Sequence, residues 1–171
     1  MRIVAGKFGG RDLTSPNDFR VRPTAEHVRA ELLDMLRADV PNARVLDLFA
    51  GTGALGLEAM SRGALRADFV ETRPASLHAL RANVAALRLR ERTRIFKRDA
   101  LPFAAALTAD MYDITFLDPP YGSRMLDRVL ESWRANRFSR ILAVEHAPTH
   151  ELPAGEDSRR FAESALTIYR L

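Results

Sequence analysis

The sequence contains no cysteine among its 171 residues, which excludes disulfide bonds and metal centres built from thiolates. Its four histidines, His27, His78, His146 and His150, are scattered, and we expect no metal site. No apolar run approaches the length of a membrane span, and no start resembles a secretory signal. We therefore expect a cytoplasmic protein without membrane association.

Lysine is almost absent as well. Only Lys7 and Lys97 are lysines among 26 basic residues, and the rest are arginines. The formal charge is +4 and the sequence pI about 10.1, which is compatible with a polyanionic partner but does not establish one. Hydrophobic residues make up 47% and charged residues 28%, so the chain is long and apolar enough for one ordinary globular domain.

Strands and helices alternate along most of the chain, which predicts an α/β fold with a doubly wound, mostly parallel sheet. Residues 1–13 are predicted to form a small hairpin, and a helix opens at Pro23 with Thr24 as its N-cap. We divide the chain into an N-terminal extension (1–40) and a main domain (41–171). The predicted strands are 45–48, 68–71, 94–97, 113–118, 141–145 and a final pair within 161–171; the predicted helices are 54–62, 74–87, 101–107 and 125–133.

Residues 114–121 read Ile-Thr-Phe-Leu-Asp-Pro-Pro-Tyr, the most informative segment of the chain. Prolines cannot continue a strand, so they predict a rigid corner after Asp118, at the strand end where open α/β sheets bind ligands. The corner offers the Asp118 carboxylate, the Pro119 carbonyl and the ring of Tyr121. These groups suit a planar ring with an amino group, such as a nucleobase. The alternative is a strand-ending turn with a surface tyrosine.

Gly51, Gly53 and Gly56 follow a strand in the spacing G-x-G-x-x-G, and Glu71 lies 20 residues after Gly51. This pattern is typical of dinucleotide sites. Asp47 argues against that interpretation, because a carboxylate at the strand end suits a cationic ligand better than a pyrophosphate. The chain also offers no domain for a nicotinamide.

S-adenosylmethionine explains these residues better. Its sulfonium and ammonium suit Asp47, its ribose hydroxyls suit Glu71, and its adenine suits the Asp99 carboxylate. Glycines in the loop allow the backbone to approach the ligand. Packing is the alternative role for Gly53, and a helix N-cap is the alternative for Asp99. The predicted cofactor-binding residues are Asp47, Phe49, Gly51, Thr52, Gly53, Glu71, Asp99 and Ala100.

The chain resembles class I S-adenosylmethionine-dependent methyltransferases. More narrowly, it resembles the RsmD-type enzymes, which methylate the 2-amino group of a guanine in bacterial small-subunit ribosomal RNA. The resemblance rests on residues 1–7, on Arg22-Pro23-Thr24, on the segment 46–59 and on Asp118-Pro119-Pro120-Tyr121. It implies a Rossmann-like sheet of seven strands with the last one antiparallel, no metal, and an N-terminal extension that contributes to RNA binding.

Two positions depart from the family pattern, because His27 replaces an arginine and Ala30 replaces a glutamate. Residues 88–94 form a basic run, but it precedes a strand and therefore lies away from the corner; we interpret it as a solvated face. The predicted substrate-binding residues are Lys7, Arg11, Arg22, Thr24, Arg29 and Tyr121, with Arg20 as a further phosphate candidate.

The resemblance assigns catalysis to Asp118, Pro119, Pro120 and Tyr121, with Asp118 and the Pro119 carbonyl accepting the hydrogens of the amine while Tyr121 stacks on the base. Alternatives stay open from the residues alone. They are methylation of adenine N6 or cytosine N4, methylation of a small molecule or protein amide, an NAD(P)-dependent reductase, and a non-catalytic RNA-binding module. The expected partner is ribosomal RNA or the small ribosomal subunit, and the expected state is a monomer.

Overall fold

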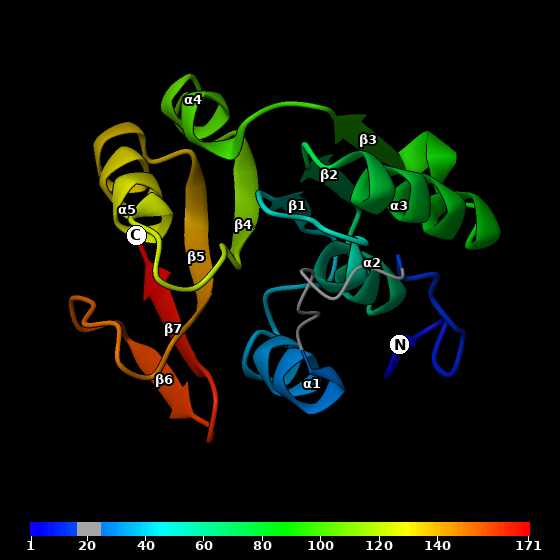
Figure 1. Ribbon diagram of the computed structural model, residues 1–171, viewed down its shortest axis with the longest axis horizontal. Helices are drawn as coiled ribbons and strands as arrows, with labels where there is room; N and C mark the ends of the chain where they lie inside the picture. Colours follow the sequence, from blue (N-terminus) through cyan, green and yellow to red (C-terminus); the bar gives the residue numbers. More distant parts are fainter. Residues whose placement is uncertain (17–24) are drawn as a thin grey trace.

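A computed structural model describes residues 1–16 and 25–171. Its centre is a seven-stranded sheet in the order β3-β2-β1-β4-β5-β7-β6 (Figure 1). Strands β1 to β5 pair in parallel, whereas β7 runs antiparallel to both β5 and β6. The strands are β1 (Arg44–Asp47), β2 (Arg66–Val70), β3 (Thr93–Phe96), β4 (Tyr112–Leu117), β5 (Ser139–His146), β6 (Asp157–Arg160) and β7 (Ala165–Arg170).

Helices cover both faces of the sheet. Side chains of α1, α2 and α3 belong to one core cluster, and those of α4 and α5 belong to the other. Neighbouring residues of a strand point to opposite faces, so Val45 joins the first cluster and Leu46 the second. The helices are α1 (Glu26–Met35), α2 (Ala54–Ser61), α3 (Pro74–Ala86), α4 (Ala100–Ala105) and α5 (Met125–Asn136), with a 3-10 turn, η1 (Arg90–Arg92), before β3.

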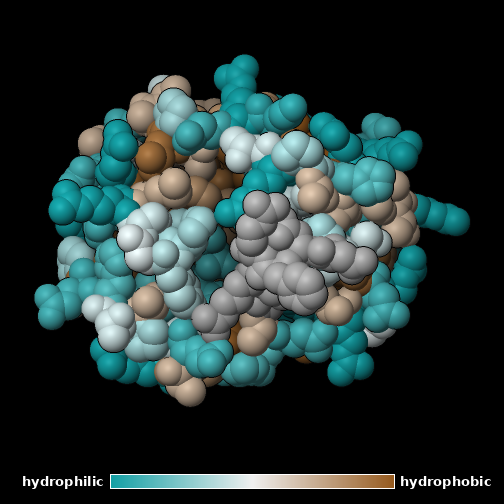
Figure 2. Space-filling model, viewed as in Figure 1, coloured by the Kyte–Doolittle hydropathy of each residue, from teal (hydrophilic) through white to brown (hydrophobic). Residues whose placement is uncertain are grey.

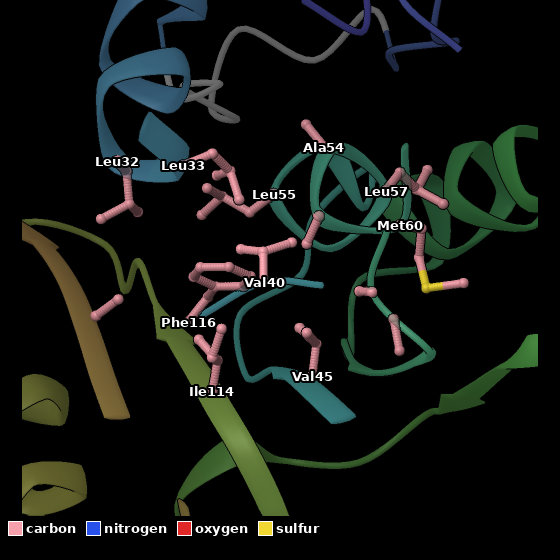
Figure 3. Close-up of a cluster of buried hydrophobic side chains, with 14 of the residues drawn as sticks. Leu32, Leu33, Val40, Val45, Ala54, Leu55, Leu57, Met60, Ile114 and Phe116 are labelled. Carbon is pink, nitrogen blue, oxygen red and sulfur yellow. The ribbon is translucent and has the colours of Figure 1, made fainter. Parts of the chain in front are cut away.

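Figure 3 shows how the first cluster forms beneath the helices. Leucines from α1 and α2 meet Val45 of β1 and Phe116 of β4, and Phe116 is fully buried. The carboxyl ends of the parallel strands emerge beside this core. The packing therefore fixes the strand ends that carry the predicted site.

The doubly wound fold and the antiparallel last strand are confirmed, and most predicted elements match within about two residues. The largest difference lies in the tail, where β6 begins at Asp157, before the predicted range. The N-terminal hairpin is reduced to one antiparallel bridge between Arg2 and Asp12. Helix α1 has Ala25 as its N-cap, so the predicted cap is wrong; Thr24 itself lies outside the described residues.

The N-terminal segment is attached to α2 through Glu58, which is completely buried. The backbone N–H groups of Val4 and Ala5 donate to its two carboxylate oxygens at 2.8 and 2.9 Å. Arg29 and Arg62 donate to the same two oxygens at 3.4 and 3.1 Å. We call these five residues the Glu58 clamp. Ile3 and Leu13 also join the first core cluster, so the described part of the extension shares its core with the sheet.

Among the described residues, no helix is long and apolar enough to cross a membrane. Hydrophilic residues predominate on the face shown in Figure 2, with hydrophobic ones in small recessed areas.

Candidate active site

A cavity of about 770 Å³ opens at the carboxyl ends of the parallel strands. This volume falls in the range of small-molecule sites, and the position is where doubly wound sheets bind ligands. Most of the predicted cofactor and catalytic residues line it, although they come from four different strand ends. They are Asp47, Phe49, Gly51, Thr52, Glu71, Asp99, Ala100, Asp118, Pro119, Pro120 and Tyr121.

The two loop glycines have different roles. Gly51 adopts a φ of +53°, and a Cβ there would meet nothing within 4 Å, so the backbone is open to a ligand. Gly53 adopts a φ of +84°, but its Cβ would lie 2.4 Å from Leu80 Cδ1, on the packed side of the loop. Gly53 is buried and does not line the cavity. The alternative role of Gly53 in packing is therefore confirmed, and its contact with the cofactor stays a prediction.

Asp47 is almost completely buried at the end of β1, and its Oδ2 accepts the Gly56 N–H at 3.1 Å. Burial raises its pKa from 3.8 to about 7, the Gly56 hydrogen bond opposes this rise, and the nearby Glu71 carboxylate adds to it. A positively charged group of a ligand would stabilise the ionised form of this buried carboxyl. Asp47 therefore lines the cavity as a carboxyl that is only partly ionised at neutral pH.

We predict that Asp47 makes the ligand-free protein less stable as the pH rises. Between pH 3.8 and about 7 the folded protein holds a proton that the unfolded chain has lost, so the free energy of unfolding falls with pH and the penalty is complete above pH 7. The slope from this group is at most about 1.4 kcal/mol per pH unit. Urea titrations from pH 5 to 8 should show this slope in the wild type relative to Asp47→Asn. Parallel profiles for the two proteins would contradict the assignment.

Glu71 and Asp99 follow β2 and β3, and both carboxylates organise the backbone at the cavity edge. Glu71 Oε2 accepts from the Gly51 N–H at 2.8 Å, and its Oε1 accepts from Thr72 and Arg73, each at 2.8 Å. Asp99 is the N-cap of α4, where its Oδ1 accepts the Leu101 N–H at 2.8 Å. The N-cap alternative for Asp99 is thus confirmed. A carboxylate can accept about four hydrogen bonds, and these contacts use three on Glu71 and one on Asp99, so both side chains keep capacity for a ligand donor.

The corner after β4 forms as predicted. The strand ends at Leu117, Pro119 is buried, and Tyr121 is 38% exposed at the cavity wall. Tyr121 donates a hydrogen bond to Glu145 Oε1 at 3.3 Å. Ser123 closes the turn by donating to the Pro120 carbonyl at 2.8 Å. The ring of Tyr121 is therefore held at the cavity by its hydroxyl.

Comparison with known proteins shows the family of this chain. A model of the family described as conserved hypothetical protein 95 matches residues 1–161. The chain belongs to this family. Ribosomal RNA small subunit methyltransferase D from Escherichia coli K12 is 36% identical over 158 residues, which cover 90% of this chain and 78% of that protein. The resemblance to RsmD-type enzymes is confirmed.

Two solved structures have a similar fold to this chain. A hypothetical protein from Thermus thermophilus is 32% identical with a TM-score of 0.84, over 100% of this chain and 99% of that one. An RNA methyltransferase from Salinibacter ruber, solved in complex with S-adenosyl-L-homocysteine, has a TM-score of 0.70 at 14% identity, over 87% of this chain and 93% of that one. The second likeness shows the fold alone.

Apart from Tyr121 at the corner, the predicted substrate residues divide into three groups. Lys7 and Arg11 are exposed, although Arg11 donates to the Ala86 carbonyl at 3.1 Å. Arg22 and Thr24, like the further candidate Arg20, lie outside the described residues. Arg29 is fully buried in the Glu58 clamp and also donates to the Arg2 carbonyl. Burial contradicts the prediction that Arg29 contacts an RNA phosphate.

Sequence reasoning missed several cavity residues. Glu145 lies near the end of β5 and lines the cavity, much as Asp47 and Asp118 do at the ends of their strands. An acidic residue at the end of a strand is the sequence feature that could have indicated it. His27 of α1 and Phe161, before β7, also line the cavity, and their rings meet edge to face at 5.6 Å. Nothing in the sequence pairs these two residues, because they are far apart along the chain. Among the described residues, no group of three or more potential ligands could hold a metal ion.

Proposed function

We propose that the protein transfers a methyl group from S-adenosylmethionine to the exocyclic 2-amino group of a guanine in small-subunit ribosomal RNA. The observation that carries this proposal is that the glycine loop and the Asp118 corner open into one cavity. The relative from Escherichia coli, named for methylation of small-subunit ribosomal RNA, supports the same substrate class. We propose that the protein acts as a monomer in the cytoplasm.

The cavity lining fits the cofactor chemically. Gly51 leaves open space where a Cβ would project, and the acidic lining suits a ligand rich in positive charge and hydrogen-bond donors. We propose that Glu71 accepts from ribose hydroxyls and Asp99 from the adenine amino group. S-adenosylmethionine, when bound, supplies a methyl group activated by a positively charged sulfur. The acidic residues that line the cavity are Asp47, Glu71, Asp99, Asp118, Glu145 and Glu163.

The corner then aligns the guanine amine that receives the methyl group. Asp118 and the Pro119 carbonyl accept the two hydrogens of the amine, which turns the nitrogen lone pair toward the methyl group. Alignment of this kind supplies up to about 7–11 kcal/mol in favourable cases. Tyr121 stacks on the base, a contact worth about 1–3 kcal/mol. As the new N–C bond forms, Asp118 takes the proton that the nitrogen releases. The base must leave its stack to reach the corner.

The direct test uses small ribosomal subunits from a strain that lacks the corresponding methylation. They are incubated with this protein and labelled S-adenosylmethionine, and the digested RNA is analysed by mass spectrometry. We expect N2-methylguanosine as the product. Methylated adenine or cytosine would keep the reaction and overturn the base. Absence of transfer, together with a preference for NAD over S-adenosylmethionine in direct binding, would overturn the proposal.

Glu71→Ala should weaken binding of S-adenosylmethionine by about 10–100-fold, because hydrogen bonds to charged groups contribute about 1.5–3 kcal/mol. The loss would combine the ribose contact with the release of Gly51, whose N–H the carboxylate holds. Isothermal titration calorimetry measures the affinity directly. Glu91→Ala, which removes an exposed carboxylate from η1, is the matched control. An affinity within twofold of the control would show that Glu71 does not hold the cofactor.

A further inference from the structure

Glu145 lines the cavity but has no role in the mechanism above. It lies in β5, one residue before the strand ends, and only 5% of its surface is exposed. Its Oε1 accepts the hydroxyl hydrogen of Tyr121 at 3.3 Å. Glu145 therefore presents a carboxylate at the cavity wall, where a ligand can donate a hydrogen bond to it.

The sheet places Glu145 on the substrate side of the corner. Strands β4 and β5 pair in parallel with Leu117 opposite Val144, so Asp118 and Glu145 follow on adjacent strands, which lie about 4.8 Å apart in a sheet. Figure 1 shows β4 and β5 side by side. The residues proposed to hold the cofactor lie across β4, at the ends of β1, β2 and β3. A base with its amine at Asp118 and its ring against Tyr121 therefore has Glu145 beside it.

The chemistry of the bases decides what an acceptor at this place would select. In guanine, the 2-amino group is flanked by the N1–H donor on one side. In adenine and cytosine, the amino group is flanked by a ring nitrogen with a lone pair, N1 or N3. An ionised carboxylate only accepts hydrogen bonds. Glu145 would therefore bind the guanine edge and repel the lone pair of the other two bases.

We infer that Glu145 accepts the N1–H of the target guanine and sets the specificity of the enzyme for that base. This inference rests on the proposed function. The amine donates its two hydrogens to Asp118 and the Pro119 carbonyl, and N1–H donates to Glu145. All three donors on this edge of guanine are then satisfied, and both carboxylates face donors. In adenine or cytosine, the ring nitrogen beside the amino group would place a lone pair against the buried Glu145 carboxylate. A buried polar group left without a partner in this way gives strong discrimination between substrates.

Glu145 also orients Tyr121, and a purely positioning role must be separated from recognition. Tyr121→Phe removes the hydrogen bond to Glu145 but keeps both the stacking ring and the carboxylate. If Glu145 acts only through Tyr121, then Tyr121→Phe and Glu145→Gln will lower the transfer rate by similar factors and leave base preference unchanged. If Glu145 contacts the base, only Glu145→Gln will change base preference.

The test compares guanosine with 2-aminopurine riboside at the methylated position of small-subunit RNA assembled from ligated fragments. 2-Aminopurine keeps the 2-amino group but carries a lone pair at N1. We expect the wild type and Tyr121→Phe to prefer guanosine by at least about tenfold in kcat/KM. Glu145→Gln should transfer more slowly to guanosine and lose most of this preference, because its amide can donate to the N1 lone pair. The missing O6 of 2-aminopurine affects all variants alike and cancels in the comparison.

The outcomes separate the inference from the function on which it rests. No transfer by the wild type to the guanosine RNA would overturn the proposed function itself. Transfer by the wild type with the same base preference in Glu145→Gln would overturn only the role of Glu145. Thermal melting and cofactor titration of each variant confirm that the fold and the cofactor site are intact. A lost preference in a folded, cofactor-binding Glu145→Gln would establish the assignment.

Discussion

Asp118→Ala should lower kcat for methyl transfer by at least about 100-fold while the affinity for S-adenosylmethionine stays within about threefold. Loss of a positioned acid–base group typically costs about 10²–10⁴-fold. Asp118 follows β4 at the cavity, where alanine removes both the acceptor for the amine and the acceptor for its proton. Single-turnover assays on unmethylated small subunits measure the effect, and calorimetry measures the cofactor affinity.

Two further variants sharpen this experiment. Asp157→Ala removes an exposed carboxylate at the start of β6, away from the cavity, and should transfer at the wild-type rate. Asp118→Asn keeps an acceptor for the amine but cannot readily take its proton. Activity of the asparagine variant close to the wild type would limit the role of Asp118 to positioning. Activity of Asp118→Ala within a few-fold of the wild type would refute the catalytic corner.

Glu58→Ala should reduce the free energy of unfolding by about 3–5 kcal/mol, which is the usual cost of removing one partner from a buried ion pair. The carboxylate is fully buried, and its loss leaves Arg29 as an uncompensated buried charge. It also removes the acceptor for the N–H groups of Val4 and Ala5. Urea titration monitored by circular dichroism measures the change.

The matched control is Glu131→Ala, which replaces an exposed glutamate on α5. It should change stability by less than about 0.5 kcal/mol. The double variant Arg29→Met, Glu58→Met should recover part of the loss, because apolar replacements of a buried pair are often tolerated. Equal stability of Glu58→Ala and the control would mean that the clamp does not hold the N-terminal segment.

The parts of the site that sequence predicts well are those encoded in short segments. The Asp118 corner follows from two prolines after a strand, and Gly51 follows from the spacing of the loop glycines. Arg29 could not be placed in this way, because its partner Glu58 is 29 residues distant and lies on another helix. Gly53 could not be distinguished from Gly51, because the loop pattern does not say which glycine faces open space and which faces Leu80.

Glu145 differs from these cases because its signal was present. It is an acid at the end of a buried strand, as Asp47 and Asp118 are, yet without a flanking glycine or proline its position at the cavity was visible only once β5 lay beside β4. The order of strands in a sheet depends on tertiary packing and is not written in any local segment. The sequence therefore predicts the strand ends, whereas the order of strands in the sheet determines which of them line the same cavity.

The Glu58 clamp also bears on how the chain can be cut. A fragment of residues 41–171 would keep the glycine loop, all five parallel strands and the corner. From its sequence alone it would be predicted to contain the complete methyltransferase domain. Its α2 would carry a carboxylate in an apolar surrounding with Arg62 as its remaining clamp partner, and α1 would no longer cover Leu55 or Phe116. The contacts across the predicted boundary at residue 40 therefore predict that such a fragment is less stable than the whole chain.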